Sequence, residues 1–378
     1  MINMKKIALT SLLSSTLMIA GTYEYPAVYK DTRIMGMGGT NVAVGGESAA
    51  MFYNPAGLSR LDPEDGIEVE LFNINVGFSA DTIDFIKAVS DAADETAMIT
   101  ALESYYGVNN HLTFNNYSSV AYRGEKFAWS IGVLGGLEGN FQAHGLSHPS
   151  GIIELNTIVT GALVAGLAYD INDYIHVGTS LKVYEGVGVA QGFDYGDIDT
   201  IDGDTILNGG TFSATAVDLG VIYDLEGLSD IVPFSLPYEE ILHPAVGLSV
   251  MSIGSPEFGT YGSMPTTVNV GLSIEPEIPV FQNWVFAMDY IDLFKAYKDE
   301  YDGDVAKRIR LGGHVSLFDN QWVEAGLSLG MYNTSYTFGA ELRLGIFDIA
   351  YATFAEEIGA YAGQNLDRRH QIMFNIGW

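Results

Sequence analysis

Apolar and polar residues alternate at every second position along most of the chain after Gly66. In the segment 307–317 one side of an extended chain is apolar, and it carries Ile309, Leu311, Val315 and Leu317. Polar residues stand between them, and only a β-strand separates two such sets, because its successive side chains point to opposite faces. The alternation recurs to the last residue and predicts fourteen strands, at 66–78, 112–123, 126–142, 152–170, 173–190, 211–224, 244–254, 265–275, 282–294, 306–318, 321–332, 334–344, 346–354 and 367–378.

The links between these strands predict a barrel that crosses a membrane. Most strands reach the length of about 9–11 residues that a tilted strand needs to cross a bilayer. Short links (123–126, 170–173, 318–321, 344–346) alternate along the chain with long, acidic ones (79–111, 191–210, 295–305, 355–366). Short turns on one side and long loops on the other are typical of outer-membrane barrels, and an even strand count brings both chain ends to the short-turn side. The links 225–243 and 332–334 fit this scheme less well, and a soluble β-sandwich is the competing interpretation.

Aromatic residues and the last strand favour the membrane interpretation. Girdle-forming aromatic side chains stand near predicted strand ends, at Tyr122, Phe127, Trp129, Trp284, Tyr290, Phe347 and Tyr351. The last strand places Phe374, Ile376 and Trp378 on one face, and such an aromatic end is similar to the signal that outer-membrane barrels present to the barrel assembly machinery. The alternative for these three residues is an ordinary terminal strand. We therefore predict an all-β fold, a transmembrane antiparallel β-barrel of about 14 strands, with the outer-membrane bilayer and the assembly machinery as partners.

Composition narrows the partners and the compartment. A formal net charge of -30 excludes the phosphate backbone of nucleic acid as a partner. Because the chain has no cysteine, it has no disulfide framework and no cysteine metal ligand. Lys5 and Lys6 precede an apolar stretch, 7–20, in a pattern typical of a secretory signal peptide, with a buried N-terminal helix as the alternative. Residues 1–22 are therefore set apart from the fold, and the bacterial outer membrane is the predicted location.

The stretch 36–61 is rich in glycine and other small residues. It is not a dinucleotide-binding loop, because antiparallel strands follow it instead of a βαβ unit. Gly36, Gly38 and Gly39 permit tight backbone bends. Residues 48–53 are compatible with a short helix, which Pro55 should end by pushing the preceding residue out of the helical conformation.

This stretch resembles the N-terminal plug of the FadL superfamily, outer-membrane transporters of long-chain fatty acids and hydrocarbons whose relatives include TraF-like and PorV-like barrels. The resemblance is carried by Arg33-Ile-Met-Gly-Met-Gly-Gly-Thr-Asn-Val-Ala-Val and by Ala50-Met-Phe-Tyr-Asn-Pro-Ala-Gly-Leu58. It implies a fourteen-stranded barrel over 63–378, with 23–62 folded into the lumen as a plug. The plug residues expected either to contact a ligand or only to pack against the wall are Met35, Met37, Met51, Phe52, Tyr53, Asn54, Pro55 and Ala56.

The resemblance also implies a lateral exit for the ligand at a kink in the third strand. Glycines weaken a strand ladder, and the predicted kink is at Gly132, Gly135, Gly136 and Gly139, with an unopened glycine-rich strand as the alternative. The segment 81–106 departs from the family. Its pattern predicts a helix in the first outer loop, with Asp81 as N-cap and an apolar face that includes Phe85, Ile86 and Val89. This helix would form an apolar capture groove, cap the barrel or bind a partner.

Charged residues also fall on predicted lumen faces, among them Arg308, Arg310, Arg343 and Glu341. A network of paired charges is the favoured interpretation, because burying mixed charge requires pairing. The alternative is a ligand carboxylate held by Arg308 or Arg310. Acidic runs at 197–204 and 299–304 lack EF-hand spacing, and we identify no metal site, no cofactor site and no catalytic constellation, so an enzyme is not expected.

Two functions follow from these features. The first is passive transport of hydrophobic small molecules, long-chain fatty acids or hydrocarbons, by plug rearrangement and lateral release. The second is a structural or assembly barrel, PorV-like or TraF-like, that docks a partner protein at 225–243 or 81–106.

Overall fold

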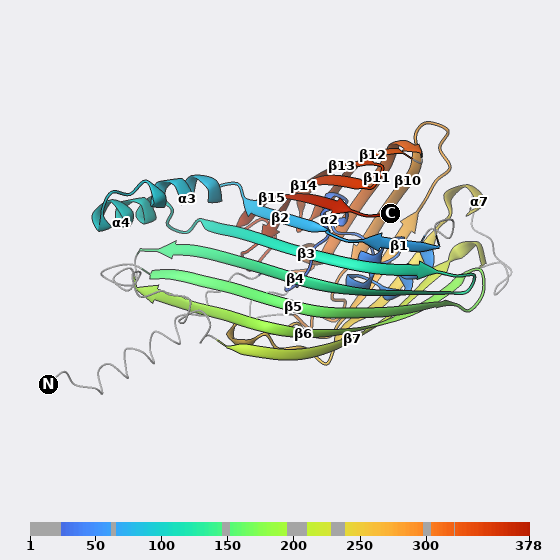
Figure 1. Ribbon diagram of the computed structural model, residues 1–378, viewed down its shortest axis with the longest axis horizontal. Coiled ribbons are helices and arrows are strands. Elements are labelled where there is room, and N and C mark those ends of the chain that lie inside the picture. The colour runs from blue at the N-terminus through green and yellow to red at the C-terminus, as the bar shows by residue number, and fades with distance from the viewer. Residues whose placement is uncertain are drawn as a thin grey trace.

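The strands of the protein close into one antiparallel barrel (Figure 1). The computed structural model describes residues 24–61, 66–145, 152–194, 210–227, 239–297, 304–320 and 322–378, so the expected signal peptide at 1–22 lies outside the described residues. The strand segments are β1 (Ile67–Glu70), β2 (Ile74–Ser79), β3 (Asn109–Arg123), β4 (Phe127–His144), β5 (Ile152–Asp170), β6 (Ile175–Asp194), β7 (Thr211–Asp224), β8 (Ala245–Ile253), β9 (Thr267–Ile274), β10 (Gln282–Tyr290), β11 (Ile309–Asn320), β12 (Val323–Tyr332), β13 (Ser335–Leu344), β14 (Phe347–Glu357) and β15 (Leu366–Ile376). Because β1 and β2 both pair with β3, they are two parts of one strand, and the predicted fourteen-stranded barrel is confirmed.

The first and last strands complete the barrel. β2 pairs with β15, and beyond β15 the backbone N–H of Val69 donates to Trp378 O at 2.8 Å while Trp378 N–H donates to Val69 O at 3.0 Å. Both ends of the barrel chain therefore lie at the same end of the barrel, as the even strand count predicts. We call this the short-turn end, since it also holds the links 124–126, 171–174, 321–322 and 345–346, and we call the opposite one the long-loop end.

The shortest link at the long-loop end is a genuine hairpin turn. β12 and β13 pair up to Tyr332 and Ser335, which leaves two residues to form the turn. Asn333 has φ of 49° and Thr334 has φ of 65°, as a type I′ turn requires at both central positions. The strand count predicted around this turn is therefore correct.

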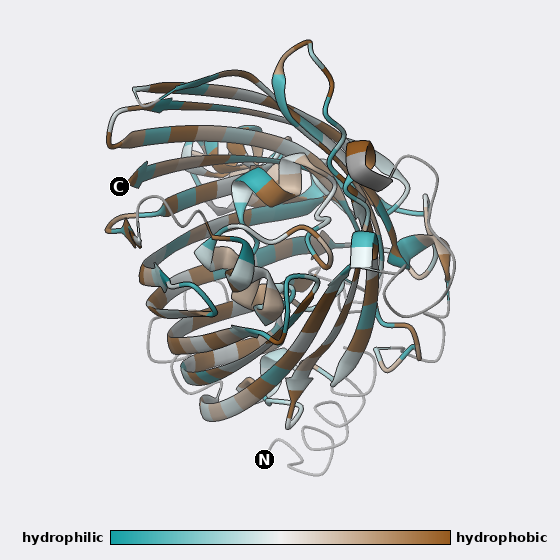
Figure 2. Ribbon diagram, turned by 90° about the vertical axis from the view of Figure 1, so that its right-hand side faces the viewer, coloured by the Kyte–Doolittle hydropathy of each residue, from teal (hydrophilic) through white to brown (hydrophobic). Residues whose placement is uncertain are grey.

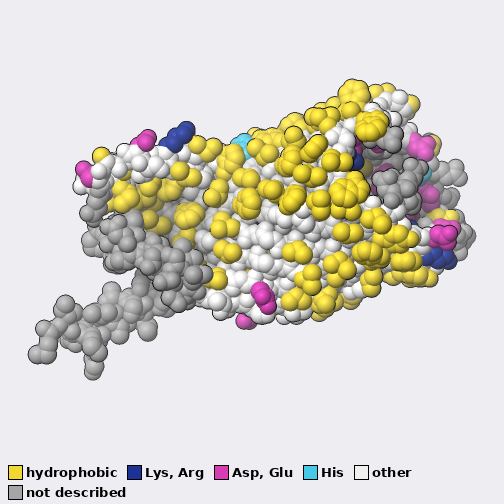
Figure 3. Space-filling view, viewed as in Figure 1, with side chains coloured by type: hydrophobic (Ala, Val, Ile, Leu, Met, Phe, Trp, Pro, Cys, Tyr) yellow, Lys and Arg dark blue, Asp and Glu magenta, His cyan; other side chains and the backbone are white. Residues whose placement is uncertain are grey.

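The outer face of the barrel is apolar. Side chains alternate between buried and exposed along the strands, as in β5 and β7. Figure 3 shows apolar side chains over much of one outer face, with most of the charged ones toward its two ends. Exposed aromatic residues mark the short-turn end, where Phe318, Trp322 and Phe347 lie. A predominantly apolar belt edged by aromatic side chains is the surface that suits a lipid bilayer.

The N-terminal segment 24–61, which we call the plug, lies inside the ring of strands (Figure 2). Its short helices are α2 (Thr32–Gly36), η1 (Ser48–Phe52) and η2 (Pro55–Arg60). The helices in the links between strands are α3 (Thr82–Ser90), α4 (Glu95–Ser104), η4 (Leu225–Gly227), α7 (Glu239–Leu242), η5 (Gly259–Tyr261) and η6 (Ala306–Arg308). No helix in the described part of the chain is long and apolar enough to span a membrane.

The first strand contains a bulge that the sequence did not predict. Glu70 pairs with Ser119 and Ile74 pairs with Asn116, so three residues on one strand face two on the other. This is the one-residue excess of a β-bulge, which bends a strand and breaks its ladder locally. At the bulge Leu71 and Phe72 are exposed, whereas Asn73 is fully buried.

Candidate functional site

The plug contacts the wall most closely at glycines of the strands. A Cβ added to Gly339 would lie 2.8 Å from the Cα of Gly36, and one added to Gly330 would lie 2.7 Å from the backbone N of Gly38. Such contacts essentially never occur for real Cβ atoms, so only glycine fits at these positions. We call the set the glycine seam, and its wall members are Gly178, Gly220, Gly247, Gly271, Gly312, Gly330 and Gly339. We did not identify the seam from the sequence, although glycine inside a strand is a known signal of close backbone approach.

Asn54, in the Asn-Pro-Ala motif, joins three parts of the structure. Its side-chain NH₂ donates to Val42 O at 2.6 Å within the plug and to Val221 O at 3.2 Å in the wall. Its side-chain oxygen accepts from the backbone N–H of Ala56 at 3.1 Å and so caps η2, which begins at Pro55. Asn54 is completely buried. The Asn54 amide therefore makes the hydrogen bonds that water would make to these three backbone groups if they were exposed.

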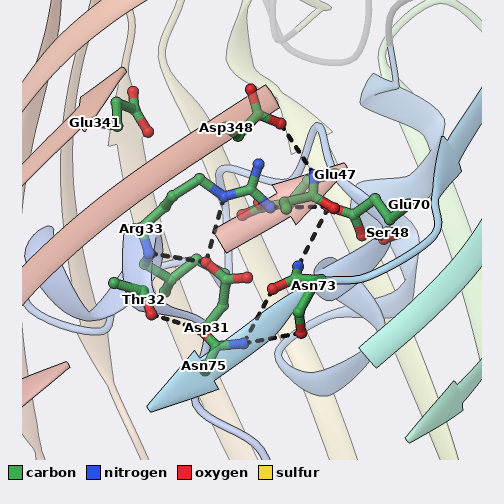
Figure 4. Close-up of polar contacts among 12 residues, drawn as sticks. Asp31, Thr32, Arg33, Glu47, Ser48, Glu70, Asn73, Asn75, Glu341 and Asp348 are labelled. Carbon is green, nitrogen blue, oxygen red and sulfur yellow. Dashed lines mark hydrogen bonds and ion pairs between the residues drawn. The ribbon is translucent and has the colours of Figure 1, made fainter. Parts of the chain in front are cut away.

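A polar cluster fastens the other side of the plug to the wall (Figure 4). The guanidinium of Arg33 lies 2.9 Å from Glu47 and 3.3 Å from Glu70, the last residue before the bulge. The Ser48 hydroxyl donates to the Glu70 carboxylate at 2.6 Å. We call this cluster the polar latch, and its members are Asp31, Arg33, Glu47, Ser48, Glu70 and Ser119.

A second group of charges fixes the start of the plug near the long-loop end. Arg369 of β15 donates to both carboxylate oxygens of Glu24, at 2.9 and 2.7 Å, and Lys30 lies 2.6 Å from Glu24 and 2.6 Å from Glu356. Burial alone would raise the pKa of Glu24, but the charges of Arg369 and Lys30 hold that pKa below its ordinary value. Glu24 is therefore ionised. These charges are paired with one another, as expected for a lumen that holds a network of paired charges.

A cavity of about 100 Å³ lies between the plug and the wall. Its apolar and aromatic lining comes from the plug at Tyr25, Tyr29, Met35, Phe52 and Tyr53, and from the wall at Tyr184, Met251, Met264, Ile291 and Tyr332. Of the expected contact residues, Met35, Phe52, Tyr53 and Arg310 come together here. The others do not line it: Met37 packs at Gly312, Met51 at Gly166, and Pro55 and Ala56 at Gly178.

Phe52 holds the centre of an aromatic cluster at this cavity. Its ring centroid lies 4.8 Å from that of Tyr29 and 5.1 Å from that of Tyr117. The ammonium of Lys182 lies 4.9 Å from the Phe52 ring centroid, a cation–π distance. A phenyl ring is thus accommodated between two tyrosines and a cation in the lumen.

The charged residues predicted to face the lumen have three different kinds of partner. Arg308 is almost fully buried and donates to the backbone oxygens of Tyr297 and Asp304, so it holds the link between β10 and β11. Arg343 pairs with Glu324 at 2.8 Å and Asp348 at 2.7 Å, and Glu341 lies 3.4 Å from His314. Arg310 alone of these lines the cavity.

The third strand is not kinked at its glycines. β4 pairs without a register shift with β3 over 128–142 and with β5 over 127–144, and both ranges include Gly132, Gly135, Gly136 and Gly139. Gly132 instead makes room for the ring of Tyr117, since a Cβ there would lie 2.5 Å from it. Glycine lowers the stability of a ladder but does not interrupt it where both neighbouring strands stay in register. Irregular pairing occurs elsewhere in the wall, at Leu71–Asn73 and in the pairs β7–β8, β10–β11 and β11–β12. An exit at the β4 glycines stays a prediction without a kink to support it.

The expected helix of the first outer loop is present as α3 and α4. Phe85 and Val89 pack against the cluster of Leu102 and Ala143, whereas Ile86 is exposed. Asp81 stands before α3, but its side chain makes no capping hydrogen bond. Most of the other expected docking segment, 225–243, lies outside the described residues, at 228–238. Phe374 of the C-terminal strand is exposed and stacks on Phe347 with centroids 6.2 Å apart, and Trp378 is exposed as well.

Solved transporter structures share this architecture. The toluene transporter TbuX of Ralstonia pickettii is 14% identical, with a TM-score of 0.54 over 92% of this chain and 97% of that one. The toluene transporter TodX of Pseudomonas putida is 12% identical, with a TM-score of 0.52 over 94% and 98%, and a TodX mutant described as a monoaromatic hydrocarbon channel gives 0.55 at 12% identity over 94% and 98%. No protein-family model matches the sequence, and no curated protein matches it significantly. At such identities the likeness concerns the fold alone, and it confirms the fold that the resemblance implied: this chain is a fourteen-stranded barrel of the kind seen in TbuX and TodX.

Proposed function

We propose that this protein is an outer-membrane channel for small hydrophobic compounds, which cross it by passive diffusion when the plug rearranges. The observation that carries the proposal is the cavity between plug and wall, with Met35, Phe52 and Tyr53 on one side and Tyr184 and Met251 on the other. Ligand sites are typically concave and mostly apolar. Structures of the same fold described as toluene transporters support the same class of ligand.

The size of the cavity favours compact molecules over long-chain fatty acids. An apolar cavity of about 150 Å³ is enough to bind benzene. The present cavity of about 100 Å³ would accept a ring of that size after a small shift of plug side chains such as Phe52. A monoaromatic hydrocarbon is therefore our choice of first substrate.

Lateral release into the bilayer would use the bulge of the first strand. Three residues face two here, and Leu71 and Phe72 are exposed beside the bulge. Other strand pairs also have register shifts, as between Val217 and Leu219, but this bulge is the one that borders the polar latch. On its inner side the polar latch closes the path through Arg33 and Glu70. Release at this place therefore requires that the latch opens first.

A reversible disulfide between plug and wall tests whether plug movement is needed. The hydroxyl oxygens of Ser48 and Ser119 lie 2.9 Å apart, and the chain has no cysteine of its own. We expect oxidised Ser48→Cys/Ser119→Cys protein to lose most uptake of radiolabelled toluene in an outer-membrane-bearing host, and reductant to restore it. A disulfide forms between side chains at such short range when the geometry permits.

The two single cysteine variants are the controls, because neither can cross-link plug to wall. Both should transport as the unmodified chain does, with or without reductant. Undiminished uptake by a fully oxidised, correctly inserted double variant would contradict the proposal.

A further inference from the structure

The protein is strongly acidic, yet the charged side chains that line the cavity are all basic. Lys30, Lys182 and Arg310 contribute to its lining, and among the described residues that line it there is no aspartate or glutamate. Two of the three cations are already neutralised. Lys30 lies 2.6 Å from both Glu24 and Glu356, and Lys182 lies 2.8 Å from Asp218.

Arg310 is different, since it makes no ion pair with any residue in the described part of the chain. One of its terminal NH₂ groups donates to the plug at Gly39 O, 3.2 Å away, and its guanidinium lies 4.8 Å from the ring centroid of Tyr332. Its Nε is buried and has no hydrogen-bond partner. Among the described residues, Gly39 is thus the one hydrogen-bond partner of this guanidinium, and its remaining terminal N–H groups are left to bind a ligand at the cavity.

The acid opposite Arg310 on the neighbouring strand holds the plug. Asp289 is the partner of Arg310 in the β10–β11 ladder. Its Oδ2 accepts from the backbone N–H groups of Asn41 at 2.8 Å and Val42 at 3.0 Å, whereas its Oδ1 is buried without a hydrogen-bond partner and makes no ion pair with Arg310. An incompletely partnered cation in a water-poor site is costly, which makes it a strong receptor for an anion. The planar fork of arginine suits a carboxylate in particular.

We infer that the cavity binds the anion of a compact organic acid, with its carboxylate on Arg310 and its apolar body against Met35, Phe52 and Tyr53. The inference rests on the proposed function and narrows its ligand from hydrophobic compounds in general to acids with a small apolar body. Benzoate is the simplest aromatic member of this class, and octanoate is an aliphatic one. The sequence left Arg308 and Arg310 as equal candidates for such a contact, but Arg308 is committed to the backbone of Tyr297 and Asp304.

Binding to the purified full chain in mild detergent, measured by titration calorimetry, tests the inference. Benzoate is compared with benzamide, which has nearly the same shape and no charge, and with toluene and octanoate. We expect benzoate to bind more tightly than benzamide by roughly tenfold or more, as a charge-assisted pair should. Arg310→Gln should remove that preference while it leaves toluene binding within about twofold. Arg310→Lys should keep part of the preference, since it keeps the charge without the fork.

Arg343→Gln is the matched control, because it removes another lumen arginine that does not line the cavity. It should leave the preference for benzoate unchanged, and the heat-dependent gel shift of a folded barrel shows that each variant is intact.

Octanoate binding without benzoate binding would still support an acid ligand and would make its body aliphatic. Equal affinity for benzoate and benzamide, or a preference that survives Arg310→Gln, would overturn the inference. If toluene binds and the acids are not preferred, the inference fails but the proposed function stands. If no probe binds and the Ser48–Ser119 cross-link does not reduce uptake, the inference and the proposed function both fail.

Discussion

The plug meets the barrel wall in two different ways. Along β6–β9 and β11–β13 it lies on the glycine seam, where most of the closest contacts join backbone to backbone, as between Gly36 and Gly339. At β1 and β3 it is held by the polar latch, where Arg33 and Ser48 reach the carboxylate of Glu70. Close steric contacts fix a position, whereas water can replace hydrogen bonds and exposed ion pairs at little net cost. If the plug rearranges as proposed, we therefore expect it to stay in place at the seam and to open at the latch, which is also the side of the bulge.

The strongest test of the comparison is to fill the seam. In Gly339→Val the added Cβ would lie 2.8 Å from the Cα of Gly36, where only backbone can give way. We expect a loss of about 3 kcal/mol or more in plug docking, the upper range for overpacking. Hydrogen exchange of plug peptides measures it, since it reports the free energy of local opening.

Gly135→Val is the matched control for this variant. It adds the same side chain to a strand glycine where a Cβ meets nothing within 4 Å, so plug exchange should stay within about 0.5 kcal/mol of the parent. Similar losses in the two variants would show that glycine matters here for strand formation and not for the approach of the plug.

Removing the Asn54 side chain should have an intermediate effect. Asn54→Ala deletes three hydrogen bonds and leaves Val42 O, Val221 O and Ala56 N–H buried without this partner. We expect plug docking to weaken by about 2 kcal/mol, since each orphaned buried group costs on the order of 1–3 kcal/mol and water entering the space recovers part of it. The barrel should still assemble, because the wall strands keep their own pairing. Exchange protection in the plug that equals the parent's would show that the seam alone holds this region.

The sequence predicted the barrel well because membrane strands obey a strict period of two. The strands at 152–170 and 211–224 agree with the structure to the residue. Register shifts have no such signature, so the bulge at Leu71–Asn73 was missed and a kink was expected in β4 instead.

The site was harder to predict, because it depends on which segments meet. Arg308 ends η6 and Arg310 lies two residues on in β11, yet only Arg308 donates to the backbone oxygens of Tyr297 and Asp304. Likewise, Gly220 and Gly247 look like ordinary strand glycines until the plug is placed against them. The Asn-Pro-Ala motif marked the plug correctly, but its role as a clamp between Val42 and Val221 is a fact of the fold.

The smallest effect we expect is a pH dependence that belongs to the latch and not to the seam. Burial raises the pKa of Glu47 well above its ordinary value, and the neighbouring carboxylates of Asp31 and Glu70 raise it further, against the opposing charge of Arg33. A carboxyl whose pKa is higher in the docked than in the released plug favours docking while it is protonated. That contribution is complete below the ordinary value of 4.5 and is lost as the pH rises through the raised pKa.

Plug peptides should therefore exchange hydrogen faster at mildly alkaline than at mildly acidic pH, after correction for the intrinsic rate. The effect is modest because the Glu47 side chain is 20% exposed and lies 2.9 Å from Arg33. Glu47→Gln imitates the protonated state and should make the exchange independent of pH at the slower level. Gly339→Val should instead keep the parent's pH dependence on top of its larger loss, because the substitution leaves the carboxylates of the latch unchanged. A pH dependence that Glu47→Gln retained would contradict this prediction, because another carboxyl that holds the plug, in the latch or at Asp289, would then have to titrate.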